Sequence, residues 1–350
     1  MHNQLSKQQV FDLSQPCVRD LAWSLWGPAL LEHSAPYTEA HHFPLDLEWL
    51  HSLDQNSEVL SAYLNNKNTR LLGTYFEALW QFYFSHHPRF KRCINNLQVF
   101  KLDHKPKQNP KRKIGKQTLG EFDVLVKEHT HYYHVELTCK FYLELPTSSS
   151  NLPASSLWLG PNCRDRLDIK YDKTDNKQMP LLLTKQGRET VIQAFNDRSI
   201  PADCIDQMTI NTFQQIAIWR GHLFDKEHWV KYKNLTAQLA VIDKTICANR
   251  SKWIIANKHQ WLSPMVISGT EKEENMMSSL QLLRYAEDYF REKEEPFVLI
   301  SPFMLILLHF DEPRNQWQQS EQFFITANTW PHGELSESAA IPLRPCSPPL

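Results

Sequence analysis

The feature that most limits how this chain can fold is the segment 119–141, LGEFDVLVKEHTHYYHVELTCKF. It has the pattern of two β-strands joined by a short polar turn. Side chains on a strand alternate between its two faces, so Glu136, Thr138 and Lys140 are expected on one face of the second strand. The opposite face is apolar, which predicts that it packs against another layer of structure. The first face instead carries an acid and a base in a row.

The first strand adds a second carboxylate to this pattern. If the hairpin closes at Lys127 and Tyr132, Asp123 lies near the start of the strand pair and can approach Glu136. Two carboxylates and a lysine on adjacent strands can hold a divalent cation and position a water or a phosphate beside it. The same residues can also form an ordinary ion pair on a solvent-facing strand. The pattern leaves both interpretations open.

A predicted helix precedes the hairpin. In the segment 70–85, RLLGTYFEALWQFYFS, apolar residues recur at helical spacing and predict an amphipathic helix with a wide apolar face. Glu77 lies at the margin of that face. A helix glutamate in this position is most often solvated, but it can also point toward the strand pair as an outer metal ligand or a base.

This order of a helix with Glu77, a strand with Asp123, a turn, and a strand with Glu136 and Lys140 resembles the PD-(D/E)XK nuclease core. The resemblance implies an α/β fold with an α-β-β-β-α-β core, in which a mixed sheet is flanked by helices. It also implies that Mg²⁺ (or Mn²⁺) lies between Asp123 and Glu136 while a lysine assists the attacking water. Five segments are moreover similar to those of a bacterial domain-of-unknown-function family grouped with that superfamily: RDLAWSLWGPALL (19–31), GTYFEALWQF (73–82), GEFDVLV (120–126), HVELTCKFYL (134–143) and WLGPNCRDRLDIK (158–170).

The lysine is the point at which this chain departs from the superfamily. The usual E-x-K spacing would place the lysine at position 138, where this chain has Thr138. Lys140 is the next residue on the same face, about 6.6 Å further along a strand that rises roughly 3.3 Å per residue. Lys170, after the hairpin, is a second candidate. The departure bears on catalysis more than on the fold.

A basic segment leads into the strand that carries Asp123. Residues 101–116, KLDHKPKQNPKRKIGK, contain seven Lys or Arg residues and one Asp. Such a run is either a solvated loop or a contact surface for phosphate, and the two interpretations are equally open here. Arg166 and Lys170 can line the same cleft, although surface ion pairs are their commoner fate. The residues predicted to contact nucleic acid are Lys111, Arg112, Lys113, Lys116, Arg166 and Lys170.

Composition predicts a globular protein of the cytoplasm. The 350 residues carry a net charge of −1 and are 41% hydrophobic. No run of about 18 uncharged apolar residues is present, so no membrane span is expected. The first residues lack the apolar core of a signal peptide. Seven cysteines without C-x-x-C pairs argue against a disulfide framework or a zinc site and suit a reducing compartment.

We expect four regions along the chain: N-terminal helices (1–66), the PD-(D/E)XK-like core (67–230), a C-terminal α+β extension (231–331) and a disordered tail (332–350). Helices are expected near 17–32, 46–64, 70–87 and 276–293, with a helical stretch from about 162 to 196 that is interrupted near Pro180. Strands are expected near 92–102, 213–224 and 251–262, in the hairpin, and in the segments PFVLISPFMLILLHF and EQFFITANTW.

The function predicted from these features is Mg²⁺-dependent hydrolysis of phosphodiester bonds in DNA or RNA. Asp123 and Glu136 would hold the metal, Lys140 would orient the water, and Glu77 would take an outer position. The alternative is a catalytically inactive nuclease-fold module that binds nucleic acid or a protein partner, and Thr138 favours it. A structural component of a larger assembly is a third possibility, which rests on the C-terminal extension.

Overall fold

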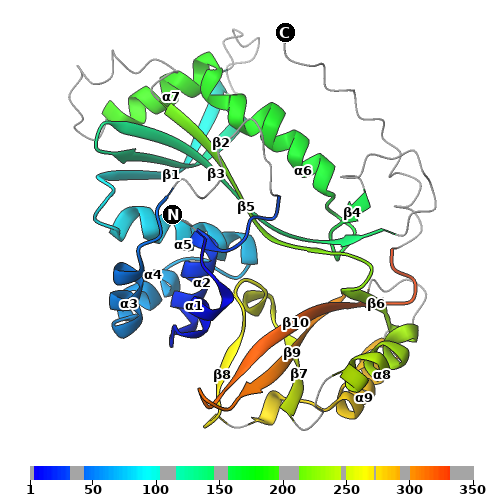
Figure 1. The fold of residues 1–350 in the computed structure, drawn as a ribbon. Helices are drawn as coiled ribbons and strands as arrows, with labels where there is room; N and C mark the ends of the chain where they lie inside the picture. The colour runs from blue at the N-terminus through cyan, green and yellow to red at the C-terminus, as the bar shows by residue number, and fades with distance from the viewer. Residues whose placement is uncertain are drawn as a thin grey trace. The chain divides into compact units, whose positions relative to one another are not determined.

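The computed structural model divides the chain into two compact units, each assembled from separate stretches of sequence (Figure 1). Unit 1 comprises residues 1–140, 171–221 and 258–264, and unit 2 comprises 141–170, 222–257 and 265–350. The predicted ranges 67–230 and 231–331 therefore cross the boundaries between units. The structure describes residues 4–31, 43–102, 116–145, 157–196, 213–245, 250–271, 273–291 and 300–331. Most of the predicted basic segment and the predicted tail 332–350 lie outside these ranges.

Unit 1 begins with helices whose starts follow from local sequence. Ser6 forms a capping box with Gln9, and Asp46 accepts a hydrogen bond from the backbone N–H of Trp49 at 2.9 Å. Pro16 occupies the first turn of the second helix, where its missing N–H costs nothing. The helices are α1 (Lys7–Phe11), α2 (Pro16–Trp26), α3 (Leu47–Gln55), α4 (Glu58–Asn65) and α5 (Leu72–His86).

Three antiparallel strands follow these helices, and a fourth strand joins them later in the chain. The strands are β1 (Arg92–Leu102), β2 (Lys116–Glu128), β3 (His131–Glu144) and β5 (Phe213–Phe224), and β5 pairs with β3. Lys127 pairs with Tyr132, as predicted for the closure of the hairpin. Between β3 and β5 the chain forms α6 (Leu167–Lys173), a π-helical turn η3 (Thr174–Gln178), a 3₁₀ turn η4 (Met179–Leu183) and α7 (Lys185–Asn196).

The sheet of unit 1 is covered on both faces. One face carries Val124 and Val135 and packs with the aromatic side of α5 in the larger core cluster. The other face carries Leu125 and Tyr132 and packs against η4 and α7. Figure 1 shows α5 and α7 on opposite sides of the strands. Both faces of β3 are therefore buried, including the face that carries Glu136.

The close contact between β3 and β5 requires a glycine. Gly221 has φ 124°, and a Cβ atom there would lie 1.7 Å from the carbonyl oxygen of Lys140. The preceding residue, Arg220, is buried and donates hydrogen bonds to the carbonyls of Ser24 and Leu25. These are among the last carbonyls of α2, which have no partner inside the helix. Arg220 thus ties the end of α2 to the sheet.

Unit 2 contains a second sheet of mixed direction, with the order β6-β10-β9-β7 and with β8 paired to β10. The helices α8 and α9 share a core cluster with this sheet through Leu239, Phe290 and Leu305. β4 (Trp158–Leu159) lies in unit 2 by sequence, but it pairs with the end of β3 in the first sheet, Leu159 with Leu143. The remaining elements are β6 (Trp229–Lys231), α8 (Leu235–Thr245), β7 (Ser251–Ala256), β8 (Val266–Ser268), α9 (Ser279–Arg291), β9 (Phe303–Asp311) and β10 (Gln316–Thr326), with short 3₁₀ turns at Tyr232–Asn234, Lys258–Trp261 (assigned to unit 1) and Glu273–Asn275.

Most predicted elements are found, with corrections at several boundaries. The first predicted helix ends at Trp26, because Gly27 takes an extended conformation and is followed by Pro28. The predicted helix 46–64 is two helices, interrupted at 56–57. The predicted strand 251–262 ends at Ala256 and continues as a 3₁₀ turn. The helices α1 and α8 were not predicted.

The structure defines helices within 4–31, 43–102, 157–196, 213–245, 250–271 and 273–291. None of them is long and apolar enough to cross a membrane.

Candidate functional site

The regular alternation of β2 breaks at Asp123. Val124 packs in the cluster on the α5 face, but Phe122 packs in the cluster on the opposite face, although residues two apart on a strand normally share a face. Across the ladder, Asn96 of β1 occupies the position opposite Asp123 and has φ 51°. A left-handed residue inside a strand is uncommon. Local irregularities of this kind re-aim a side chain within a sheet.

The irregularity directs the carboxylate of Asp123 toward the neighbouring strand. Its Oδ2 atom accepts a hydrogen bond of 2.8 Å from the backbone N–H of Leu137. The paired register of β2 and β3 runs from Val124 and Val135 to the turn, so this contact lies just beyond its end. At that point a side chain joins the two strands. Asp123 is thereby held at the backbone beside Glu136.

Glu136 is almost fully buried, with 2% of its surface exposed. Its Oε1 atom lies 2.8 Å from Nε2 of His134, and its Oε2 atom accepts a hydrogen bond from the amide of Gln178. Burial lowers the pKa of His134 to about 4, and the charge of Asp123 opposes this shift only in part. His134 is therefore neutral at pH 7, and neither donor brings a positive charge to Glu136.

The hydrogen-bond partners of His134 define its tautomer. Gln215 contacts the carbonyl of Met179 at 2.6 Å, and a carbonyl only accepts, so the contacting group is the NH₂ of the amide. The same NH₂ lies 3.1 Å from Nδ1 of His134, which must then be the acceptor. Nε2 consequently carries the proton and donates it to Glu136.

These contacts form a closed circuit that we call the Glu136 ring. It runs from Glu136 to His134, Gln215 and the carbonyl of Met179, then along the backbone to Gln178 and back to Glu136. The ring joins β3, β5 and the junction of the π-helical and 3₁₀ turns. It lies on the sheet face opposite α5.

The other predicted catalytic residues lie nearby in sequence or on the flanking helix. Lys140 is half-buried on β3, and Thr138 is buried between it and Glu136. Glu77 is half-buried on α5, which covers the other face of the sheet. One turn later on α5, Gln81 donates a hydrogen bond of 2.8 Å to Asn96 at the irregularity. The catalytic roles of Glu77 and Lys140 stay predictions.

The residues predicted to contact nucleic acid are only partly described. Lys111, Arg112 and Lys113 lie outside the described ranges, and Lys116 is placed by its backbone, which pairs with Leu102. In unit 2, Arg166 is buried in a bidentate ion pair with Asp168, with contacts of 2.6 and 2.8 Å, and Lys170 is half-exposed on α6. The predicted contacts with nucleic acid remain untested for all six residues.

The donor set near Asp123 suits some metal ions and not others. Within the described part of the chain, no three or more His, Cys, Asp and Glu side chains are grouped so that they could hold a metal ion. A closed structural zinc site of four ligands would need such a group. Mg²⁺ instead binds through one or two carboxylates and keeps several waters. Asp123 and Glu136 fit that requirement in type and number.

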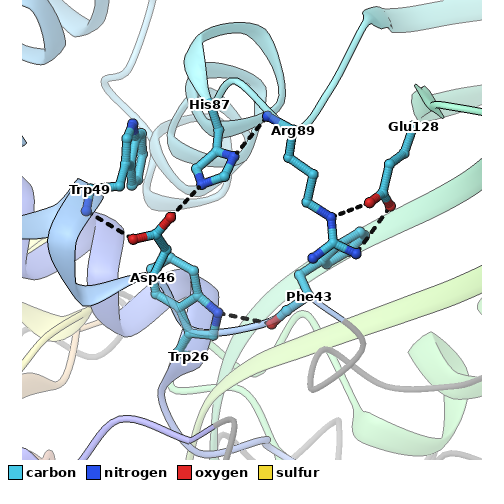
Figure 2. Close-up of polar contacts among 7 residues, drawn as sticks. All are labelled: Trp26, Phe43, Asp46, Trp49, His87, Arg89 and Glu128. Atoms are coloured by element: carbon cyan, nitrogen blue, oxygen red, sulfur yellow. Dashed lines mark hydrogen bonds and ion pairs between the residues drawn. The ribbon is translucent and has the colours of Figure 1, made fainter.

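A second polar network in unit 1 has a different character (Figure 2). The guanidinium of Arg89 makes a bidentate ion pair with Glu128, which also accepts a hydrogen bond of 3.1 Å from Tyr133. Next to it, Nδ1 of His87 accepts from the backbone N–H of Arg89, and Nε2 of the same ring lies 3.3 Å from Asp46. This network fastens the end of α5 to the start of α3 and to β2.

The fold defines a mixed α/β protein with antiparallel and mixed sheets. The chain belongs to the family described as a domain of unknown function, DUF1853, whose model matches residues 19–326. Comparison with curated proteins gave no match. Comparison with solved structures also gave none.

Three members of the Glu136 ring were not predicted from the sequence: His134, Gln178 and Gln215. His134 lies two residues before Glu136, and period-two alternation alone would have placed it on the same face. Gln215 is a polar residue near the start of an otherwise apolar strand. Gln178 carried no signal, because the π-helical turn that presents it has no recognisable sequence pattern.

Proposed function

We propose that this protein is a Mg²⁺-dependent nuclease-like protein that hydrolyses phosphodiester bonds in nucleic acid. The observation that carries the proposal is the break in β2, which brings the carboxylate of Asp123 to the backbone beside the buried Glu136. The order α5, β1, β2, β3, α7, β5, with β5 paired to β3, supports it further. It is the α-β-β-β-α-β order of the PD-(D/E)XK core that the sequence resembles.

In this proposal Asp123 and Glu136 hold the metal (Mg²⁺ or Mn²⁺). When bound, such an ion lowers the pKa of a coordinated water and offsets negative charge on the phosphate. Asp123 is oriented by the N–H of Leu137, and Glu136 is oriented by the Glu136 ring. Lys140 orients the attacking water, and Glu77 takes an outer position on the side of α5. Each of these roles belongs to a side chain that variants can test.

The proposed substrate is DNA or RNA. Support comes from the seven Lys and Arg residues in 101–116. Leu102 pairs with Lys116, so the ends of this segment are joined by the β1–β2 ribbon that carries Asp123. A segment with this charge, adjacent in sequence to the strand of a metal carboxylate, is suited to contact phosphate groups.

A second candidate function is a nuclease-fold module that binds nucleic acid or a protein partner without cleaving it. The observation that favours it is Thr138, which is 4% exposed and occupies the position of the superfamily's lysine. A buried threonine has no charge with which to activate a water. The fold and the ring would then persist as a binding scaffold.

Cleavage by the full-length protein separates the two functions. Single- and double-stranded DNA and RNA are incubated with the protein in Mg²⁺, in Mn²⁺ and in EDTA. We expect metal-dependent cleavage that Asp123→Asn abolishes while the protein stays folded. Glu189→Gln is the matched control, because it neutralises an exposed carboxylate on α7 and should leave cleavage unchanged. Cleavage that persists in EDTA or in Asp123→Asn would contradict the proposal, and binding without cleavage would favour the module.

A further inference from the structure

We propose that His134, Gln178 and Gln215 are positioning residues that hold the Glu136 carboxylate in one orientation toward a divalent cation. This inference rests on the proposed function, because it takes Glu136 to be a metal ligand. It assigns a role to residues that do not belong to the acid–acid–lysine pattern of the sequence. The geometry of the ring and the unusual turn that completes it support the inference.

The geometry fixes both oxygens of the carboxylate from different directions. His134 holds Oε1 from the same strand, and Gln178 holds Oε2 from the π-helical turn. His134 is itself held by Gln215, which is anchored to the carbonyl of Met179. Since each side chain is restrained by the next, the carboxylate cannot rotate without breaking at least one hydrogen bond. Outer partners of this kind orient metal ligands in proteins.

The ring contacts each oxygen of the Glu136 carboxylate once. An ionised carboxylate has about four lone-pair positions on its two oxygens. The ring hydrogen bonds take one position on each oxygen. Buried charges in proteins are generally paired or coordinate metals. The ring hydrogen bonds thus hold Glu136 without using all of its lone-pair positions.

The turn that supplies Gln178 is of a type associated with function. Residues Thr174–Gln178 form a π-helical turn that passes directly into the 3₁₀ turn starting at Met179. π-Helical turns are rare and occur frequently at functional sites. Here the change of helix type places the Gln178 side chain and the Met179 carbonyl on the same ring. An uninterrupted α-helix would direct these two groups differently.

Metal affinity distinguishes a positioning role from a purely structural one. Binding of Mn²⁺ to the full-length protein is measured by electron paramagnetic resonance for the wild type, Gln178→Leu, His134→Leu and His134→Gln. We expect the two leucine variants to bind Mn²⁺ about 10- to 100-fold more weakly, the usual effect of removing an outer partner. His134→Gln can still donate to Glu136 and should recover most of the affinity. Gln319→Leu removes a buried glutamine of unit 2 as a control and should bind like the wild type.

The outcomes separate this inference from the proposed function. Folded leucine variants that bind Mn²⁺ as tightly as the wild type would overturn the positioning role and leave the metal site intact. A wild-type protein that binds no Mn²⁺ would overturn the proposed function, and the inference with it. Affinity lost equally in Gln319→Leu would show that the effect is a general loss of stability, which also contradicts the inference.

A second measurement uses the wild-type ring and does not depend on the folding of the leucine variants. Nitrogen-15 resonances of the histidine side chains report which ring nitrogen carries the proton. We expect His134 to be the neutral Nε2–H tautomer, and its resonances to shift on addition of Mg²⁺ in the wild type but not in Asp123→Asn. The Nδ1–H tautomer, or resonances that ignore Mg²⁺, would overturn the inference.

Discussion

Two buried glutamates of unit 1, Glu128 and Glu136, differ in the side chains that hold them. Glu128 is paired with the guanidinium of Arg89, so its charge is neutralised where it lies (Figure 2). Glu136 receives its ring hydrogen bonds from a neutral histidine and a neutral amide. Both side chains are well buried, at 7% and 2% exposure. The same residue type on the same sheet is thus held once by a guanidinium and once by a ring of neutral side chains.

The difference indicates what each carboxylate does. A neutralised carboxylate contributes to holding elements together, as Glu128 of β2 does with Arg89, three residues after the end of α5. A carboxylate whose two oxygens are oriented by a ring of hydrogen bonds, as in Glu136, has the fixed geometry that a metal ligand requires. Substitutions at Glu128 should therefore mainly lower stability, and substitutions at Glu136 should mainly weaken metal binding.

The largest effect on stability is expected at the charge-paired site. Arg89→Leu leaves Glu128 without its guanidinium and should lower the free energy of unfolding by about 3 kcal/mol, the low end for breaking a buried pair, because Arg89 is partly exposed. Chemical denaturation followed by tryptophan fluorescence measures the change. The double variant Arg89→Leu/Glu128→Leu should recover much of the loss, and a double variant as unstable as the single one would show that the pair itself is not the cause.

An intermediate effect is expected when each glutamate is converted to glutamine. Glu128→Gln weakens charge-assisted hydrogen bonds to Arg89 and should cost about 1.5–3 kcal/mol. Glu136→Gln removes a buried charge, and Gln178 can reverse its amide to accept from the new NH₂, so the change should stay within about 1 kcal/mol. Mn²⁺ affinity should respond in the reverse order. Equal losses of stability in the two variants would remove the contrast between the sites.

The smallest effect is a pH dependence at His87. Burial lowers the pKa of His87 below its ordinary value of 6.5, although Asp46 opposes the shift. At pH values between that lowered pKa and 6.5, His87 binds more protons in the unfolded chain than in the folded protein. Its contribution to stability is therefore complete above pH 6.5 and is lost as the pH falls. His87→Gln keeps a donor for Asp46 without the titration. The stability advantage of the wild type over this variant should shrink between pH 7.5 and 5.5, whereas a constant difference would count against the shift.

Much of unit 1 could be predicted because its strands and helices follow strong periodic patterns. The predicted strands 92–102 and 213–224 coincide with β1 and β5, and the hairpin closes at Lys127 and Tyr132 as expected. In each case a run of apolar residues is bounded by turn residues, and local sequence is sufficient. The same holds for the helical stretch that is interrupted near Pro180, where α6 gives way to the π-helical and 3₁₀ turns.

The site itself was predicted only in part, because its geometry depends on departures from regular structure. Alternation predicts the faces of β2 correctly until Asp123, where the left-handed Asn96 on the neighbouring strand accompanies the change. Gln178 lies 42 residues after its acceptor Glu136, and Gln215 lies 81 residues after its acceptor His134. Contacts of that sequence separation are set by tertiary packing, which no local pattern encodes.

The central claim is that Asp123 and Glu136 hold one divalent cation where β2 and β3 separate. Crystals of the full-length protein grown with Mn²⁺ and measured at the manganese absorption edge test it directly. We expect an anomalous-scattering peak about 2 Å from a carboxylate oxygen of each residue, with Glu136 still bonded to His134 and Gln178. Manganese bound elsewhere, with none between these two carboxylates, would contradict it.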